Sequence, residues 1–417
     1  MLLGFASSAQ STFSDKKSRG QIVTTKTQLP FLTLLLMISF ASVNAVLFTP
    51  ALPTIAKFFA VSDGTAQQTI TWFLIGYAVG QLIYGPLANR FGRKPALYVG
   101  IMLQILSSLV CVLAGLIHIY SILVLGRLLL ALGSGVGLKM TFTLVNETCE
   151  PSIASKKISY LMIAFAITPG LAVMIGGMLM TYFVWTSTFY AGAIYGVILL
   201  LLVKKLPETK KQLDRDALQL NHLVHGYVNQ FKNLQLVAGG LLMGGATCFV
   251  YVFAALAPFI AITLMHMSVA SYGVANLLPP IGLIAGSLTS ARLATRYKPM
   301  LIITLGIVLA FMGSLLMLLL VFMKLQAIIA LFVPMMICYF GLSLVFANAS
   351  TLAMSRSSDK AHASAVMNFI NMGLVTLVVL TLGLFKANSF LLPVIYSVIA
   401  CFMMILSQFA FRQGKCS

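Results

Sequence analysis

The chain has 417 residues, of which 60% are hydrophobic and only 8% are charged. A soluble domain cannot bury that much apolar surface, so this composition indicates a polytopic membrane protein. The formal net charge of +19 would suit an anionic partner such as nucleic acid, but the positions of the charges favour membrane topology as its cause.

Twelve apolar runs are each long enough to cross a bilayer, whose hydrocarbon core of about 30 Å needs about 20 helical residues. They predict an all-α membrane protein with transmembrane helices at 30–56, 66–88, 95–117, 121–144, 158–183, 186–203, 234–262, 270–293, 299–322, 326–352, 362–384 and 389–411. The one long polar connection separates the sixth run from the seventh. The predicted domains are an N-terminal cytoplasmic tail (1–29), a six-helix bundle (30–203), a cytoplasmic linker (204–233), a second six-helix bundle (234–411) and a C-terminal tail (412–417).

The basic residues set the expected orientation. If both termini are cytoplasmic, the Lys and Arg residues fall in cytoplasmic tails and loops, except for Lys57, Lys324 and Lys386 on the outer side and Arg127 and Lys139 within a span. Positive charge in short loops resists translocation across the membrane. We therefore expect a multi-pass protein of the inner, or cytoplasmic, membrane with both termini in the cytoplasm. This topology accounts for the basicity and removes the need for a nucleic-acid partner.

A short basic turn between the second and third runs reads GPLANRFGRK, from Gly85 to Lys94. A stretch of the same character, GSLTSARLATRYKP, begins at Gly286, at the matching point of the second half. The first turn resembles the signature between the second and third helices of the major facilitator superfamily, in which the residue at Asn89 is an aspartate. The resemblance implies two pseudo-symmetric six-helix bundles that rock about a shared site near the middle of the membrane.

Further stretches narrow the resemblance. QTITWFLIGYAVGQLIYGPLANRFGRKP, RLLLALGSGVG from Arg127 and PGLAVMIGG from Pro169 are similar to the Bcr/CflA drug-resistance transporters. That subfamily implies a twelve-span antiporter that exchanges a small molecule for protons. Its proton-binding groups are membrane carboxylates, and the first-helix aspartate of the subfamily is Val46 here. The eight acids of this chain all lie in loops or at span edges: Asp15, Asp63, Glu147, Glu150, Glu208, Asp214, Asp216 and Asp359.

Polar groups inside the spans are the substrate-site candidates. Arg127 matches the family arginine of the fourth helix, and a charge in the bilayer interior is costly without partners. It either binds substrate or holds backbone carbonyls of the first helix. Lys139 stands where relatives carry an apolar residue, and it either lines the cavity and attracts an anion or extends to the cytoplasmic interface. The remaining candidates suit either the cavity or interhelical packing: Asn44, Gln68, Trp72, Tyr77, Tyr251, Asn276, Asn348 and Asn371.

Two groups of residues are gating candidates. The first resembles the family's cytoplasmic charge cluster, which locks the outward-facing state: Gly85, Asn89, Arg90, Gly92, Arg93 and Glu147. The second matches the antiporter signature of the fifth helix, although its second proline is Val173: Pro169, Gly170, Gly176 and Gly177. Proline removes a helix hydrogen bond and glycine permits close packing, so the second group is expected to bend or seal one side.

The function expected from these features is secondary transport by alternating access. Membrane cations without membrane acids favour an anionic cargo, and the negative-inside potential drives anions outward by about 2.3 kcal/mol per charge per 100 mV. Export of a small organic molecule, with an anionic metabolite or siderophore favoured, is the first prediction. The alternatives are a broad-specificity multidrug/proton antiporter and uptake of an anionic nutrient or siderophore.

The sequence offers no sign of an enzyme. It contains no nucleophile–base arrangement, phosphate loop or ATP-binding motif, and the spacing of its six cysteines and five histidines suits no metal site. We expect a non-enzymatic monomer with no cofactor and no metal, whose partners are a small-molecule substrate and the lipid bilayer.

Overall fold

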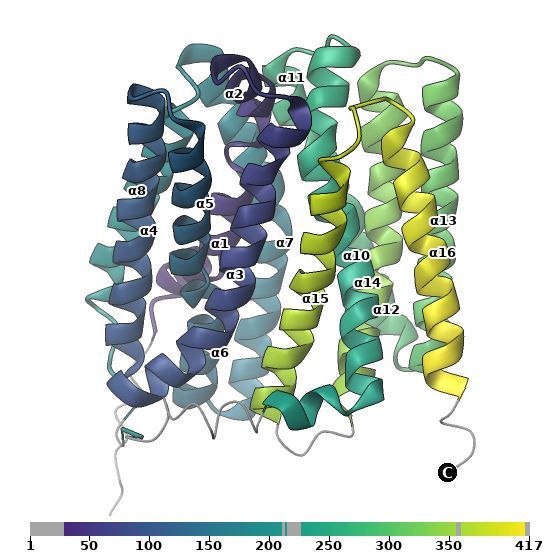
Figure 1. Cartoon of the computed structure of the whole chain (residues 1–417). Helices are drawn as coiled ribbons and strands as arrows, with labels where there is room; N and C mark the ends of the chain where they lie inside the picture. Colours follow the sequence, from purple (N-terminus) through teal and green to yellow (C-terminus); the bar gives the residue numbers. More distant parts are fainter. Residues whose placement is uncertain (1–28, 211–212, 215–226, 356–359, 413–417) are drawn as a thin grey trace, which may run out of the picture.

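The computed structural model describes residues 29–210, 213–214, 227–355 and 360–412. The predicted tails 1–29 and 412–417 therefore lie almost entirely outside the described residues, as do 211–212 and 215–226 of the predicted linker. The described part is helical and forms two bundles that stand side by side (Figure 1).

The first bundle contains six spans, some of them made of two or three consecutive helices. They are α1 (Phe31–Val46) with η1 (Thr49–Ala51) and α2 (Leu52–Phe58); α3 (Asp63–Phe91); α4 (Arg93–Leu116); α5 (Tyr120–Ser134) with α6 (Val136–Thr148); α7 (Pro151–Tyr182); and α8 (Ser187–Val203).

The second bundle repeats this pattern. Its spans are α10 (Leu234–Pro258) with η2 (Phe259–Leu264); α11 (Val269–Ala275) with α12 (Leu278–Leu293); α13 (Pro299–Phe322); η3 (Ile328–Phe332) with α14 (Val333–Met354); α15 (Lys360–Leu382); and α16 (Leu391–Arg412). Within the described residues, 11 segments are long and apolar enough to cross a membrane, and Ser187–Val203 is a shorter apolar helix. The predicted all-α fold is confirmed.

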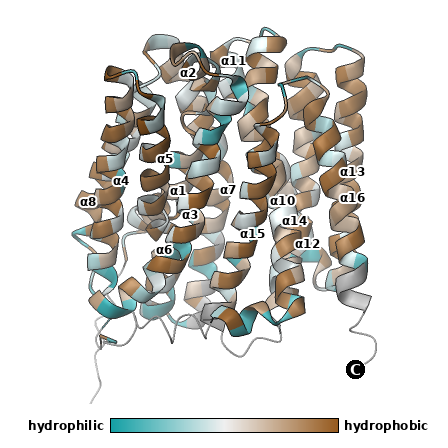
Figure 2. Ribbon diagram, in the orientation of Figure 1, coloured by the Kyte–Doolittle hydropathy of each residue, from teal (hydrophilic) through white to brown (hydrophobic). Residues whose placement is uncertain are grey.

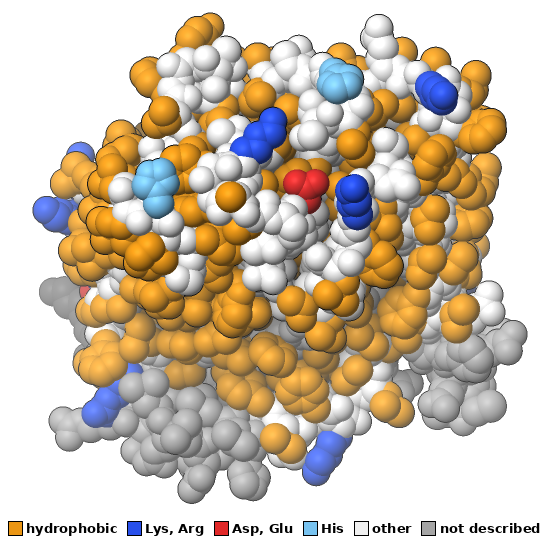
Figure 3. Space-filling model, turned by 45° about the horizontal axis from the view of Figure 1, so that its top comes forward, with side chains coloured by type: hydrophobic (Ala, Val, Ile, Leu, Met, Phe, Trp, Pro, Cys, Tyr) orange, Lys and Arg blue, Asp and Glu red, His pale blue; other side chains and the backbone are white. Residues whose placement is uncertain are grey.

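We call the end of the bundles at which α3 gives way to α4 the linker end, and the end that carries α2 and α11 the opposite end (Figure 1). Hydrophobic residues dominate the helices between the two ends, and hydrophilic residues concentrate at the ends themselves (Figure 2). The opposite end shows few charged side chains among many hydrophobic ones (Figure 3). This banding is what a bilayer-spanning protein requires, because backbone and charged groups at mid-depth find no water.

Prolines accompany the breaks in the first and eighth spans. The first span is interrupted after Val46, and Pro50 lies within the short 3-10 turn, Thr49–Ala51, that follows. The eighth is interrupted at Asn276 and Leu277, just before Pro279 and Pro280. Proline has no backbone N–H and cannot continue the hydrogen-bond pattern of a helix that precedes it. The sequence placed these runs correctly but did not indicate that they are broken.

The two bundles approach each other most closely through glycines in the half away from the linker. An added methyl group at Gly64 of α3 would overlap the carbonyl oxygen of Gly383, which follows α15. At Gly177 of α7 it would lie 3.1 Å from the Cα of Gly273 in α11. These backbone-to-backbone contacts hold the opposite end closed in this structure.

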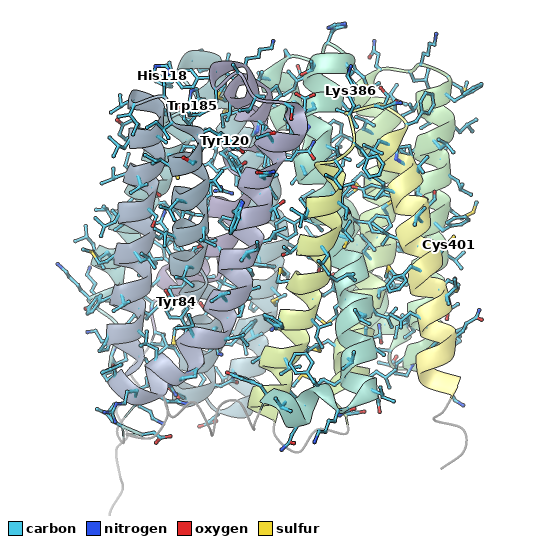
Figure 4. The ribbon with its side chains drawn as sticks, viewed as in Figure 1. Tyr84, His118, Tyr120, Trp185, Lys386 and Cys401 are labelled. Carbon is cyan, nitrogen blue, oxygen red and sulfur yellow. The ribbon has the colours of Figure 1, made fainter. Side chains whose placement is uncertain are left out.

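A layer of aromatic side chains covers the opposite end of the first bundle. The rings of Phe58 and His118 stack with centroids 4.5 Å apart, and Trp185 meets Phe58 edge-on at 5.4 Å. Figure 4 shows His118, Trp185 and Tyr120 gathered at this end. Stacked and edge-to-face rings are favourable arrangements that tie α2, α4 and α8 together.

Candidate functional site

Arg127 of α5 lies in the interior of the first bundle and is 1% exposed. Its guanidinium donates to the carbonyl oxygens of Asn44 (2.7 Å) and Ala45 (3.2 Å) at the end of α1, and to that of Thr69 (3.3 Å) in α3. The rings of Phe48 and Phe73 lie 3.9 and 4.4 Å from the guanidinium carbon. These contacts match the carbonyl-binding alternative of the sequence analysis. They lock three helices together and occupy both faces of the cation.

Asn44 extends the polar contacts of Arg127 to α4. Its side-chain oxygen accepts from Gln104 at 2.8 Å, and the same Gln104 nitrogen also lies 3.0 Å from Ser108 Oγ and 3.0 Å from the carbonyl oxygen of Gly192 in α8. The side-chain oxygen of Gln104 is buried without a hydrogen-bond partner among the described residues. Gln104 and Ser108 were missed by the sequence analysis, although a glutamine in an apolar span was the available signal.

A small cavity of about 10 Å³ adjoins this network and is lined by Asn44, Ser108, Arg127 and Thr188, together with apolar neighbours. Its volume suits about one water molecule, which needs polar partners of this kind. The cavity is too small for an organic substrate. The Arg127 network is therefore a structural and electrostatic element in this conformation.

Tyr77 of α3 and Tyr251 of α10 bring the two bundles together near Arg127. Tyr251 lies within electrostatic range of both Arg127 and Tyr77, although it belongs to the second bundle. Tyr77 is buried, and Gln81 follows it one turn later on the same helix. Of the predicted substrate-site residues, Asn44, Tyr77, Arg127 and Tyr251 form one neighbourhood that spans the bundle interface.

Lys139 of α6 lies apart from that neighbourhood, toward the linker end. Its ammonium donates to the backbone oxygen of Gln81 in α3 at 3.0 Å. A Cβ at Gly85 would lie 2.6 Å from Lys139 Nζ, so the missing side chain of Gly85 leaves the room that the ammonium occupies. The side chain thus reaches across to α3 rather than along α6 to the end of the bundle.

The predicted charge cluster is assembled at the linker end. Arg93, the first residue of α4, donates to both carboxylate oxygens of Glu147 (2.6 and 3.3 Å) and to the side-chain oxygen of Asn89 (2.9 Å). Asn89 therefore keeps the hydrogen bond to Arg93 without the negative charge of the family aspartate. Arg90 is half-buried in the last turn of α3. The contacts of Arg93 tie α3, α4 and α6 of the first bundle to one another.

Glu208 of the linker completes this cluster and was not a candidate from sequence. Its carboxylate accepts from the backbone N–H groups of Arg93 (3.0 Å) and Lys94 (2.9 Å) at the start of α4. Partial burial opposes its ionisation, but these N–H groups and that of Lys210 hold the pKa of Glu208 below its ordinary value. Gly92 has a φ of +104°, which favours glycine, and this turn places the N–H groups of Arg93 and Lys94 within hydrogen-bonding distance of Glu208.

A second part of the linker joins the two bundles. The hydroxyl of Tyr227 donates to the carbonyl oxygen of Leu82 at 3.4 Å. That carbonyl has no helical partner, because the residue four positions later is Pro86. Phe231 meets Phe369 of α15 edge-on, with ring centroids 6.4 Å apart. The described linker residues therefore contact the first bundle through Tyr227 and the second through Phe231.

The remaining polar candidates lie elsewhere. Asn348 donates to Ser290 Oγ at 2.9 Å within the second bundle, Asn276 bonds to the carbonyl oxygen of Tyr272 at the break before α12, and Asn371 is buried on α15. Gln68 and Trp72 occupy the exposed face of α3, whereas the neighbouring Gln67 is buried. Both side-chain amide atoms of Gln67 lack a partner among the described residues.

The proline–glycine signature of α7 lies where the bundles meet. The helix continues through Pro169, and a Cβ at Gly170 would lie 2.7 Å from the carbonyl oxygen of Asn276. Gly177 packs on α11, and Gly176 packs on the carbonyl oxygen of Leu47 at the break in the first span. Helix contact alone accounts for these glycines in this conformation, and their gating role stays a prediction. Among the described residues, no group of three or more His, Cys, Asp or Glu side chains could hold a metal ion.

A comparison with protein families decides the superfamily. The family model described as Major Facilitator Superfamily matches residues 34–379. The chain belongs to this superfamily. It is accordingly a membrane transporter and not an enzyme, and its described residues form 11 candidate spans and a shorter apolar helix.

Curated relatives include drug-resistance proteins. An uncharacterized transporter of Rickettsia felis is 29% identical over 59% of this chain and 60% of its own length, so this match spans less than two thirds of the relative. A bicyclomycin resistance protein homolog of Haemophilus influenzae is 24% identical over 64% of this chain and 67% of its own. Multidrug resistance protein D of Escherichia coli is 24% identical over 78% of this chain and 80% of its own length. The predicted Bcr/CflA-type resemblance is confirmed by these relatives.

Solved structures support the fold. The crystal structure of a D-xylose-proton symporter superimposes with a TM-score of 0.74, covering 92% of this chain and 96% of that one, at 15% identity. At that identity the likeness shows the arrangement of helices alone.

Proposed function

We propose that this transporter exports small organic molecules of the drug type from the cytoplasm, with the linker end facing inward. The observation that carries the proposal is the commitment of both membrane cations to backbone carbonyls: Arg127 to those of α1 and α3, and Lys139 to that of Gln81. An anionic cargo would need a cation beside the bundle interface, whereas Arg127 is buried against carbonyl oxygens of the first bundle and Lys139 lies apart, toward the linker end. The neighbourhood at the bundle interface instead offers phenols, carboxamides and aromatic faces, which suit neutral or cationic organic molecules.

The relatives support the same choice. Two of them carry names that refer to bicyclomycin or multidrug resistance. The multidrug alternative of the sequence analysis therefore has more support than the favoured anionic metabolite, and a siderophore has none. The orientation rests on the basic residues: those of the linker end include Arg90, Arg93 and Lys94, which the positive-inside rule assigns to the cytoplasm.

Drug susceptibility tests the proposal. The chain is expressed in an Escherichia coli strain that lacks its own drug exporters, and growth is measured against bicyclomycin and ethidium. We expect the wild-type chain to raise the inhibitory concentration of at least one compound and to speed loss of preloaded ethidium. The matched control is Arg127→Met at equal membrane abundance, because it removes the contacts between α5, α1 and α3. Identical susceptibility and dye retention with and without the wild-type chain would contradict the proposal.

A further inference from the structure

Export of a cation against a negative-inside potential needs a driving ion, yet the spans within the described residues hold no acid in their interior. The described acids lie near helix ends or in the linker: Asp63, Glu147, Glu150, Glu208 and Asp214. Glu147 is bonded to Arg93, and Glu208 to the first residues of α4. The usual carboxylate proton carrier is therefore missing from the described spans. Arg127 does not replace it, since a guanidinium keeps its proton at any physiological pH.

Lys139 is the other cation in a span, and its position does not suit an interfacial anchor. Counting along α3, Gln81 lies ten residues before the last residue, Phe91, which is about 15 Å of helix. The Cε and Nζ atoms of Lys139 lie beside Gly85, and the ammonium donates to the backbone oxygen of Gln81. A lysine that extended toward water would instead direct its ammonium to the end of the bundle. The side chain is directed into the bundle.

The surroundings of Lys139 are short of groups that stabilise a charge. An ammonium has three donors, and among the described residues it has one acceptor, the oxygen of Gln81. The charged group that acts on it is Arg93 of α4, which is repulsive. Helix α1 carries no titratable side chain. The other titratable residues on the helices that pack against α6 are Asp63, Tyr77, Tyr84 and Arg90 on α3, Lys94, Tyr98 and Cys111 on α4, Tyr120 and Arg127 on α5, and Lys156, Lys157, Tyr160 and Tyr182 on α7.

Gln81 connects this lysine to the interface between the bundles. Its backbone oxygen holds Lys139, while Tyr77, one turn earlier on α3, lies within electrostatic range of Tyr251 in the second bundle. The side-chain nitrogen of Gln81 is buried without a partner among the described residues. A molecule that binds beside Tyr77 and Tyr251 would therefore change the surroundings of the residue that holds the ammonium.

From this placement we propose that Lys139 is the proton carrier of the transporter, a role that depends on the proposed efflux function. In the state open to the linker end, the ammonium gives one proton to water and becomes a neutral amine. In the state open to the opposite end, the lone pair of the amine takes one proton from water. Each cycle thus moves one proton inward as one substrate moves outward, with no other reactant.

The first test needs no substrate. Purified protein in detergent is treated with acetic anhydride at pH 7 to 8, and each lysine is followed by peptide mass spectrometry. Only the neutral amine reacts, so Lys139 is expected to be acetylated about tenfold faster than exposed Lys324 at the same pH. Gly85→Ala would push a methyl group against the ammonium and should change the rate at Lys139 but not at Lys324. A Lys139 that reacts no faster than Lys324, or does not react, would overturn the proposal.

The second test measures coupling in proteoliposomes with ethidium. An imposed pH gradient should drive uptake of the dye by wild type, and binding of the dye in weak buffer should release about one proton per dye bound. Lys139→Met and Lys139→Arg should both bind dye but release no protons, whereas the matched control Lys324→Met should behave as wild type. Proton release that persists in a folded Lys139 variant overturns the carrier role. Absence of dye binding by wild type counts instead against the proposed function, and the acetylation result still decides the role of Lys139.

Discussion

The two bundles contain the same helix–helix seam, once with a polar interior and once with an apolar one. In the first bundle, α4 and α5 pack through Gly100 and Gly133; in the second, α13 and α14 pack through Gly306 and Gly341. Each glycine lies against the backbone of the partner helix. The seam fixes the distance between the helices, because a side chain at any of these positions would push them apart.

The first seam is flanked by polar side chains, and the second is flanked by apolar side chains at the matching positions. Arg127 stands six residues before Gly133, and Met335 stands six residues before Gly341; Gln104 follows Gly100 by four residues, as Ala310 follows Gly306. All four side chains are buried. The same seam forms with or without the cation and its polar partners. The comparison indicates that this packing needs the glycines and does not need the cation.

The largest effect is expected when the first bundle is made to resemble the second. Arg127→Met leaves three buried carbonyl oxygens without their side-chain donor, and an unsatisfied buried group costs about 1–3 kcal/mol. We expect a loss of stability of several kcal/mol at most, since water can reach the small cavity, together with loss of dye efflux. The measurement is the thermal midpoint of the purified protein in detergent. Met335→Leu, the matched change in the second bundle, should cost less than about 1.5 kcal/mol. Equal losses of stability in Arg127→Met and Met335→Leu would contradict the difference between the two bundles.

Alanine substitutions at the glycines of the two seams should lower stability by similar amounts. A Cβ at Gly133 would lie 2.6 Å from the oxygen of Gly100, and one at Gly341 would lie 2.9 Å from the nitrogen of Ala310. Gly133→Ala and Gly341→Ala are each expected to cost about 1–3 kcal/mol through overpacking, read as falls in thermal midpoint. Gly373→Ala is the control, because nothing lies within 4 Å of its added methyl group. A large fall in only one half would contradict the equivalence.

A smaller effect is expected at the contact between the halves. Gly64→Ala places a methyl group on the carbonyl oxygen of Gly383 and should favour separation of the bundles at the opposite end. A cysteine at position 67, where Gln67 is buried, reports this opening. Its labelling by a membrane-impermeant maleimide should rise about tenfold, the change that a bias of about 1.4 kcal/mol produces. The same reporter combined with Gly373→Ala should label as in the unmodified background.

The smallest effect is expected at Glu208 and only in acid. Its carboxylate accepts from the start of α4, and its pKa is lower in the folded chain than the ordinary 4.5. The ionised form therefore stabilises the fold above about pH 4.5, and this contribution is lost as the pH falls through the lower folded-state pKa. The thermal midpoint of Glu208→Gln should start slightly below wild type at neutral pH and converge with it in acid. A difference in thermal midpoint that stays constant down to pH 3 would show that ionisation of Glu208 does not stabilise the fold.

Sequence reasoning recovered what depends on hydrophobicity and charge along the chain. It placed the apolar runs, because hydrophobicity can be followed directly along the chain. The expected domain boundaries and the gating role of the cluster of Arg93 with Glu147 stay predictions. Sequence reasoning did not recover contacts that depend on the rotation of a helix. Gln68 was selected and Gln67 was not, yet the second is the buried one, since adjacent residues on a helix point about 100° apart.

The hydrogen-bond partners of Arg127 and Lys139 could not be predicted from the sequence either. Every residue has a backbone carbonyl oxygen, so residue type does not indicate which one a cation binds. The hydrogen bonds of Arg127 to Asn44 and Ala45 could therefore be expected only as one alternative. The direction of Lys139 depends on the space left by Gly85, which lies on another helix.

The linker contacts suggest where this polypeptide tolerates being cut. Glu208 and Thr209 contact the first bundle, whereas Phe231 packs on the second. Two separately synthesised fragments divided between Lys210 and Tyr227 would keep Glu208 and Thr209 with the first bundle and Phe231 with the second, and the hydrogen bond from Tyr227 to Leu82 would join the two fragments. Such a pair offers a route to isotope-labelling one half at a time for spectroscopy of an otherwise unlabelled transporter.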